Sequence, residues 1–172
     1  MAKQARRLAY LDGVVFLPCR ASPHKMKAPG ASPTQRLDMI KIATKSMRWI
    51  EVSRWEIDRM PPSYSWMAAE HFTQVFPNAE LFWILGDDQW EKIHTWSKPG
   101  KLAELLTFIV IRRGKRPMKK AGYRCQIVDL SNSGSSTEAR RRIAGGKDTG
   151  GLLDRDVAGY IAKNGLYGAP PT

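Results

Sequence analysis

The feature that most constrains the fold is a run of apolar residues at positions 81–85, followed by Gly86, Asp87 and Asp88. Five apolar residues in a row without alternation predict a strand covered on both faces, as in a parallel sheet. Glycine and two carboxylates at the end of such a strand place close backbone approach and negative charge where open α/β sheets bind ligands. The run therefore predicts a binding site at this edge, and a strand end with two solvated aspartates fits the pattern equally well.

Strands and helices alternate along the rest of the chain, which favours an α/β fold with helices on both faces of a parallel sheet. Ser32 with Gln35 and, later, Asp154 are typical helix caps. The apolar spacing over residues 66–75, which ends at Val75, predicts the buried face of a helix. Buried strands are expected at 13–18, 81–85, 108–111 and 125–130, a short strand at 50–53, and helices at 2–11, 32–47, 64–75, 102–106, 135–143 and 154–161.

The length and the net charge of the chain limit the classes of protein to which it can belong. A chain of 172 residues fits a single domain over residues 1–172. Lysine and arginine number 28 against 16 acidic residues, a net charge of +12 that predicts an anionic partner; nucleic acid, nucleotides and acidic lipid all fit. Cys19 and Cys125 have neither metal nor disulfide spacing, and the apolar run 14–17 is too short to span a membrane. We therefore expect a soluble protein of the cytoplasm without a membrane partner.

The start of the helix expected at 135–143 is suited to an anion. Free backbone amides, the hydroxyls of Ser136 and Thr137, and Arg140 one turn further on would together bind a phosphate group. A capped surface helix with its arginines in water is the alternative that this pattern leaves open.

Arg112 and Arg113 follow the strand expected at 108–111, so they would lie at the same sheet edge as the glycine and the two aspartates. No P-loop or Ser-His-Asp arrangement can be recognised, and the three histidines lack ligand spacing, so no metal site built by the protein is expected. These patterns predict a site that holds phosphates without a nucleophilic side chain.

Nine short motifs follow one another in order from about Gly13 to Gly168. They are Phe16-Leu17-Pro18, Pro23-His24-Lys25, Arg36 with Met39, Pro62-Ser63-Tyr64-Ser65, Leu85-Gly86-Asp87-Asp88, Thr95-Trp96, Arg112-Arg113-Gly114, Ser135-Ser136-Thr137 with Arg140, and Gly165-Leu166-Tyr167. Their order and spacing resemble the bacterial nicotinate-nucleotide adenylyltransferase family.

This resemblance implies a Rossmann-like nucleotidyltransferase fold and a reaction of NAD biosynthesis. In that reaction the phosphate of nicotinate mononucleotide attacks the α-phosphorus of ATP in line, helped by Mg²⁺, and gives deamido-NAD and pyrophosphate. No covalent enzyme intermediate is needed, so catalysis would consist of positioning and charge stabilisation.

The resemblance also implies roles for individual residues, with ATP and nicotinate mononucleotide as partners. ATP would be bound by Gly86 and Asp88 on the adenosine side, and by Arg113, Ser135, Ser136, Thr137 and Arg140. Nicotinate mononucleotide would be bound by His24, Lys25, Ser65 and Trp96, with Trp96 against the pyridine ring. No catalytic residue and no protein ligand to the metal is identified.

The start of the sequence departs from the family, which begins with a strand and a glycine-rich loop, GGxFxPxHxGH. Met1 aligns inside the helix that follows that loop, so the first strand of the sheet is missing from this chain. We expect that the true start lies upstream of Met1. A chain that did begin at Met1 would be expected to lack activity.

Other interpretations stay open. Pantetheine-phosphate adenylyltransferase shares the phosphate-binding strand ends, although Pro62-Ser63-Tyr64 and Thr95-Trp96 argue against it. An inactive remnant, or a basic module that binds nucleotides or nucleic acid, is the alternative from another class, and its binding should weaken steeply with salt. Nucleic acid is not the expected partner, and a homo-oligomer fits the sequence as well as a monomer does.

Overall fold

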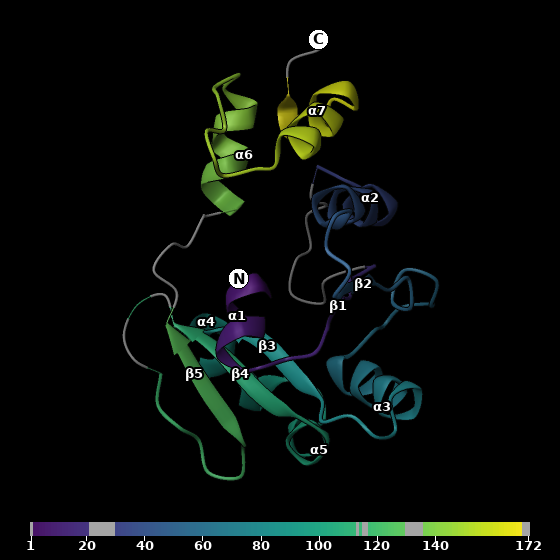
Figure 1. The fold of residues 1–172 in the computed structure, drawn as a ribbon, viewed down its shortest axis with the longest axis vertical. Coiled ribbons are helices and arrows are strands. Elements are labelled where there is room, and N and C mark those ends of the chain that lie inside the picture. Colours follow the sequence, from purple (N-terminus) through teal and green to yellow (C-terminus); the bar gives the residue numbers. More distant parts are fainter. Residues whose placement is uncertain (1, 21–29, 113, 115–116, 130–135, 170–172) are drawn as a thin grey trace. The chain divides into compact units, whose positions relative to one another are not determined.

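The structure is a computed structural model that describes residues 2–20, 30–112, 114, 117–129 and 136–169. The chain forms two compact units, each assembled from two segments (Figure 1). Unit 1 consists of Met1–Asp12 and Ser63–Ser133, and unit 2 consists of Gly13–Pro62 and Gly134–Thr172. The single domain expected from the sequence stays a prediction.

Unit 1 contains three parallel strands that lie side by side in the order β3-β4-β5 (Figure 1). They are β3 (Phe82–Gly86), β4 (Thr107–Arg112) and β5 (Cys125–Asp129). β4 lies in the middle, and all of its residues except Arg112 are buried. An unbroken apolar run is what a strand covered on both faces requires, so the prediction for residues 108–111 is confirmed.

Helices cover both faces of this sheet because alternate residues of β4 point to opposite sides. On one face, Phe108 and Val110 pack into a core with residues from other helices of unit 1. On the other face, Ile109 and Ile111 pack against Ala5. The helices of unit 1 are α1 (Ala2–Leu8), α3 (Ser65–Val75), α4 (Asp87–Glu91), the 3₁₀ turn η1 (Ile93–Thr95) and α5 (Pro99–Leu105).

Several details of unit 1 differ from the prediction. In β5, expected to be a buried strand, only Val128 is buried. In β3, Leu85 and Gly86 are buried, but Phe82–Ile84 are partly exposed. Among the described strands β3 pairs only with β4, so one of its edges is not covered by another strand. Val75, expected on the buried face of its helix, is 48% exposed because it is the last residue of α3.

Unit 2 contains two parallel strands and a cluster of helices. β1 (Val14–Phe16) pairs with β2 (Ile50–Val52), and both are only partly buried, so the fully buried strand expected at 13–18 was wrong in that respect. The helices are α2 (Pro33–Thr44), α6 (Ser136–Ala144), α7 (Arg155–Lys163) and the 3₁₀ turn η2 (Leu166–Gly168). Their core contains the buried side chains of Ala31, Ile143, Val157, Ile161 and Leu166.

The predicted caps fix the starts of two helices in unit 2. Gln35 N donates to Ser32 Oγ at 3.1 Å, and Ser32 N donates to Gln35 Oε1 at 2.8 Å, which forms a complete capping box at α2. Asp154 Oδ1 accepts hydrogen bonds from the backbone of Asp156 and Val157 at the start of α7. Within the described ranges, no helix is long and apolar enough to cross a membrane.

Candidate functional site

The carboxyl ends of β3 and β4 meet at one edge of the sheet in unit 1. Gly86 is buried and precedes α4, and it pairs in register with Ile111 of β4. Asp87 Oδ2 accepts a hydrogen bond from Gly114 N at 3.1 Å, which joins the end of β3 to the chain that follows β4. The predicted meeting of these two strand ends is confirmed.

The two aspartates at this edge differ in their contacts. Both carboxylate oxygens of Asp87 accept backbone hydrogen bonds, because its Oδ1 also accepts from Asp88 N at 3.0 Å. Asp88 is exposed, and its Oδ2 accepts a hydrogen bond from the side chain of Gln89 at 3.0 Å. The carboxylate of Asp88 is therefore the one that a ligand can reach from solvent.

A buried tryptophan ties this edge to the basic segment between β4 and β5. Trp90, in α4, is fully buried and donates from Nε1 to the carbonyl oxygen of Met118 at 2.8 Å. Lys120 Nζ donates to the carbonyl oxygen of Glu91 at 3.3 Å. α4 and residues 117–120 therefore hold each other in place.

Arg112 is not free to bind an anion. Its Nε lies 2.5 Å from Asp129 Oδ1, its register partner on β5. Arg113, which the sequence assigns to ATP, lies outside the described residues.

α6 presents one arginine without an acidic partner. Glu138 accepts hydrogen bonds from Arg141 at 2.8 and 2.9 Å and from Arg142 at 2.8 Å. These bonds lower the pKa of Glu138 to about 2. Arg140 is exposed and forms no ion pair with any residue that the structure describes.

The outward side of the α6 start is therefore suited to a phosphate. Ser136 and Thr137, at the first turn, are exposed, while Ala139 and Ile143 face the core. Hydroxyls, a helix start and an uncompensated guanidinium are the groups that bind phosphate oxygens. Arg141 and Arg142 form ion pairs with Glu138 but stay 69% and 40% exposed, so the alternative of an ordinary surface helix with its arginines in water stays open.

Two of the four residues expected to hold the nicotinate nucleotide, Ser65 and Trp96, lie in unit 1. Ser65 is the first residue of α3 and is partly buried. Trp96 directly follows η1, packs against the core of unit 1 and meets Trp83 edge to face, with ring centroids 6.4 Å apart and an interplanar angle of 82°. A ring fixed in this way can offer a firm surface to a planar ligand.

The predicted residues are divided between the units. Unit 1 holds Gly86, Asp88, Ser65 and Trp96, and unit 2 holds Ser136, Thr137 and Arg140. The remaining ones, His24, Lys25, Arg113 and Ser135, lie outside the described residues. That all these residues form one site stays a prediction.

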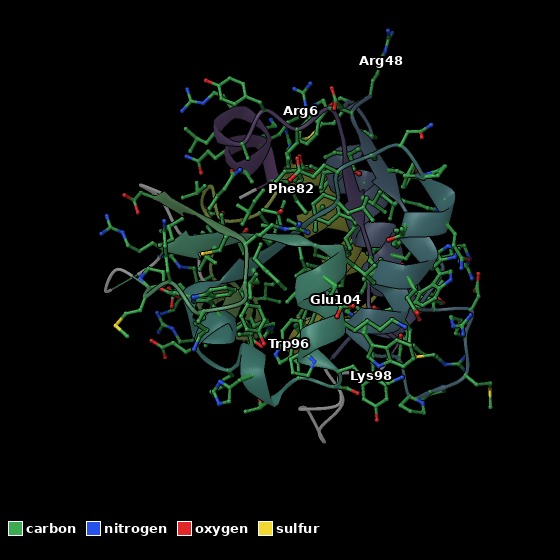
Figure 2. All side chains as sticks on the ribbon, turned by 90° about the horizontal axis from the view of Figure 1, so that it is seen from below. Arg6, Arg48, Phe82, Trp96, Lys98 and Glu104 are labelled. Atoms are coloured by element: carbon green, nitrogen blue, oxygen red, sulfur yellow. The ribbon has the colours of Figure 1, made fainter. Side chains whose placement is uncertain are left out.

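One charged residue near Trp96 was not predicted. Lys98 has a left-handed backbone conformation, with φ 49° and ψ 57°, and its ammonium lies over the ring of Trp66. Figure 2 labels Trp96 and Lys98 on the same side of the molecule. Nothing in the sequence indicates this conformation, because residues before proline rarely adopt it.

No group of three or more His, Cys, Asp or Glu among the described residues could hold a metal ion. Cys19 and Cys125 are both unpaired thiols. Burial and the nearby carboxylate of Glu56 raise the pKa of Cys19 to about 11, so its thiol stays protonated at neutral pH.

Comparison with known proteins gives consistent results. A family model described as cytidylyltransferase-like matches residues 1–142. The chain is 37% identical over 163 residues to the probable nicotinate-nucleotide adenylyltransferase of Methylacidiphilum infernorum, which covers 91% of this chain and 78% of the relative. It is 31% identical over 168 residues to the nicotinate-nucleotide adenylyltransferase of Bacillus subtilis, which covers 97% of this chain and 88% of the relative.

A solved structure shows the same fold. Plasmodium falciparum nicotinic acid mononucleotide adenylyltransferase, complexed with NaAD, matches with a TM-score of 0.77 and 18% identity over 96% of this chain and 87% of that one. At this identity the match supports the fold alone. The Rossmann-like nucleotidyltransferase fold predicted from the sequence is confirmed.

Proposed function

The chain belongs to the nicotinate-nucleotide adenylyltransferase family, and from this premise we propose that it transfers the adenylyl group of ATP to nicotinate mononucleotide. A phosphate oxygen of the mononucleotide attacks the α-phosphorus of ATP, and the bond from that phosphorus to the oxygen bridging to the β-phosphate breaks. The products are deamido-NAD and pyrophosphate. This is a step of NAD biosynthesis.

The observation that carries the proposal is the start of α6. Arg140 alone among the three consecutive arginines of this helix lacks an acidic partner in the described chain, and exposed hydroxyls of Ser136 and Thr137 lie one turn away. Because pyrophosphate leaves with negative charge, a positioned cation and hydrogen-bond donors stabilise the transition state without a protein nucleophile. Arg140, Ser136 and Thr137 therefore bind the phosphates of ATP, together with Ser135 and Arg113.

The other substrate contacts follow from the strand edge of unit 1. The buried Gly86 allows close approach of the adenosine, and the exposed carboxylate of Asp88 accepts hydrogen bonds from it. Ser65 and Trp96 hold the nicotinate mononucleotide, together with His24 and Lys25. These placements are supported by the motif order and by the rigidity of the Trp96 ring.

Magnesium fits this chemistry as a partner of ATP. It keeps most of its ligands as water and substrate phosphates and needs few from the protein. The ion would neutralise phosphate charge, while the protein positions both nucleotides. We place the enzyme in the cytoplasm, in keeping with its two unpaired cysteines.

The test compares two neighbouring arginines. Arg140→Gln should raise the KM for ATP about 10- to 100-fold, the range expected for a lost charge-assisted hydrogen bond, with little change in the KM for nicotinate mononucleotide. Arg141→Gln is the matched control and should change neither constant by much, because its guanidinium is bound by Glu138. Pyrophosphate release is measured in a coupled assay.

Three results would contradict the proposal. The assignment of α6 to ATP fails if Arg140→Gln raises the KM for the mononucleotide instead, or if both arginine variants behave alike. The activity itself is refuted if the unaltered protein releases no pyrophosphate from ATP and nicotinate mononucleotide.

A further inference from the structure

The carboxylate of Asp87 joins two strand ends that are far apart in the sequence. Its Oδ2 accepts a hydrogen bond from Gly114 N at 3.1 Å, although 27 positions separate the two residues. Asp87 directly follows β3, and Gly114 comes two residues after the end of β4. β3 and β4 lie side by side with Gly86 opposite Ile111, so this bond lies at the edge of the sheet where both strands end (Figure 1).

The other oxygen of Asp87 holds the side chain in the orientation that this bond needs. Oδ1 accepts a hydrogen bond from Asp88 N at 3.0 Å, at the start of α4. Each oxygen therefore binds a backbone amide, and hydrogen bonds to an ionised carboxylate are about twice as strong as those between neutral groups. Asp87 is partly buried, whereas Asp88 is exposed. The two neighbouring carboxylates thus differ, since Asp87 binds backbone and Asp88 is open to a ligand.

The chain that leaves β4 is held on two sides. Arg112, the last residue of β4, forms an ion pair with Asp129 of β5, and Gly114 is bound by Asp87 at the end of β3. β4 lies between β3 and β5, so the two anchors lie toward opposite neighbours of the strand. The residue between them in the sequence is Arg113, which lies outside the described residues and which the proposed function assigns to the phosphates of ATP.

The group that the structure uses at position 114 is the backbone N–H. A Cβ built on Gly114 would meet no atom of the described residues within 4 Å, apart from those of its chain neighbours. Space at this point therefore does not require a glycine. The N–H that Asp87 accepts is one that every residue except proline supplies. The hydrogen bond can for this reason be removed or kept at position 114 independently of side-chain size.

We propose that Asp87 is a positioning residue of the adenylyl transfer, and that it sets the chain after β4 for the phosphates of ATP through the amide of Gly114. The inference rests on the proposed function, in which Arg113 binds those phosphates. A side chain that binds a reacting group must be held in place before the ligand arrives, because a displacement of about 1 Å can cost about 100-fold in rate. Asp87 supplies this constraint from the neighbouring strand and does not itself touch ATP.

The test starts with the carboxylate. Asp87→Ala removes both acceptors and should raise the KM for ATP about 10-fold, the size of a lost hydrogen bond to a charged group, with the KM for nicotinate mononucleotide unchanged. Asp87→Asn keeps one acceptor in the same shape and should lose less. The control is Glu91→Gln, which removes an exposed negative charge from the last residue of the same helix and should change neither constant.

The partner of the bond gives the second half of the test. Gly114→Pro removes the N–H and should also raise the KM for ATP, whereas Gly114→Ala keeps the N–H and should retain most of the affinity for ATP. If Asp87 acts through this amide, adding Asp87→Ala to Gly114→Pro should raise the KM little further. Effects that multiply would place the carboxylate on ATP itself and overturn the proposal. Equal rises in the KM of both substrates, as a general loss of structure would produce, would overturn it as well.

Binding of ATP with Mg²⁺ in the absence of the mononucleotide, followed by calorimetry, separates this inference from the proposed reaction. Asp87→Ala should weaken ATP binding about 10-fold whether or not turnover is seen. Unchanged ATP binding would overturn the role of Asp87 and leave the proposed function intact. If the unaltered protein releases no pyrophosphate but its binding of ATP still depends on Asp87 through Gly114, the proposed reaction is wrong and the positioning role stands.

Discussion

Replacing Trp90 by phenylalanine should destabilise the protein by about 2–3 kcal/mol. The ring is fully buried and packs against Phe108 and Tyr123, with centroids 5.5 and 5.8 Å away. Phenylalanine lacks the indole N–H that donates to the carbonyl of Met118, a loss of about 1 kcal/mol. It also lacks about two buried ring carbons, which adds roughly 1.6 kcal/mol at about 0.8 kcal/mol per buried carbon.

The loss is measured by urea unfolding followed by circular dichroism, with stability extrapolated to water. It corresponds to a fall in Tm of about 5–10 °C for a chain of this size. Trp55→Phe is the control, because it removes the same atoms from a ring that is only partly buried and should cost less. Equal losses in the two variants would refute the argument that complete burial and the bond to Met118 set the cost.

The same substitution should also affect ATP more than the mononucleotide. Trp90 holds α4, which begins directly after Gly86, against residues 117–120. Loosening that anchor displaces the strand edge assigned to adenosine, so the KM for ATP should rise. A rise confined to nicotinate mononucleotide would contradict the placement of adenosine at this edge.

Three further substitutions probe unit 2. A Cβ at Gly30 would lie 3.0 Å from the backbone nitrogen of Tyr167, so Gly30→Ala should lower the free energy of unfolding, measured in urea, by about 1–3 kcal/mol. Gly159 lies in α7 with open space around its Cα, so Gly159→Ala should raise the free energy of unfolding by about 0.5–1 kcal/mol. The pKa of Glu138 is lowered to about 2 by its two arginine partners. Its contribution is therefore complete above the unfolded pKa of about 4.3 and is lost as pH falls toward 2, so the Tm difference between unaltered protein and Glu138→Gln should shrink over that range.

The sequence predicted those parts of the fold whose cause is local. The run of apolar residues in β4 requires burial on both faces, and Ser32 with Gln35 forms the capping box that their spacing indicates. α4 and η1 were not predicted, because neither is long enough to show a helical period. They are held by the complete burial of Trp90 and Ile93, which depends on residues distant in the sequence.

The candidate site shows the same division. Hydroxyls and an arginine at a helix start can be recognised from spacing alone, and the structure leaves Ser136, Thr137 and Arg140 exposed as expected. The position of Lys98 could not be recognised in this way. It depends on a backbone conformation that the following proline disfavours and on a contact with Trp66, 32 positions earlier in the sequence.

Charge pairing decides which cations of this basic chain remain available for a ligand. With 28 lysines and arginines against 16 acidic residues, many cations have no acidic residue to compensate them, so net charge alone does not indicate a site. Where several cations are neighbours, however, one carboxylate forms ion pairs with some of them and leaves another unpaired. Glu138 binds two of the three arginines of α6, and Glu70 binds one of the two lysines near Trp66.

The arginine of α6 that has no acidic partner among the described residues is the one placed beside groups that suit an anion. Arg140 adjoins the hydroxyls at the start of α6. An exposed ion pair contributes little to stability, so Glu138 matters more for holding Arg141 and Arg142 away from this position. It follows that removing Glu138 should disturb binding of ATP more than it disturbs folding, because the released arginines become rivals for the same anion.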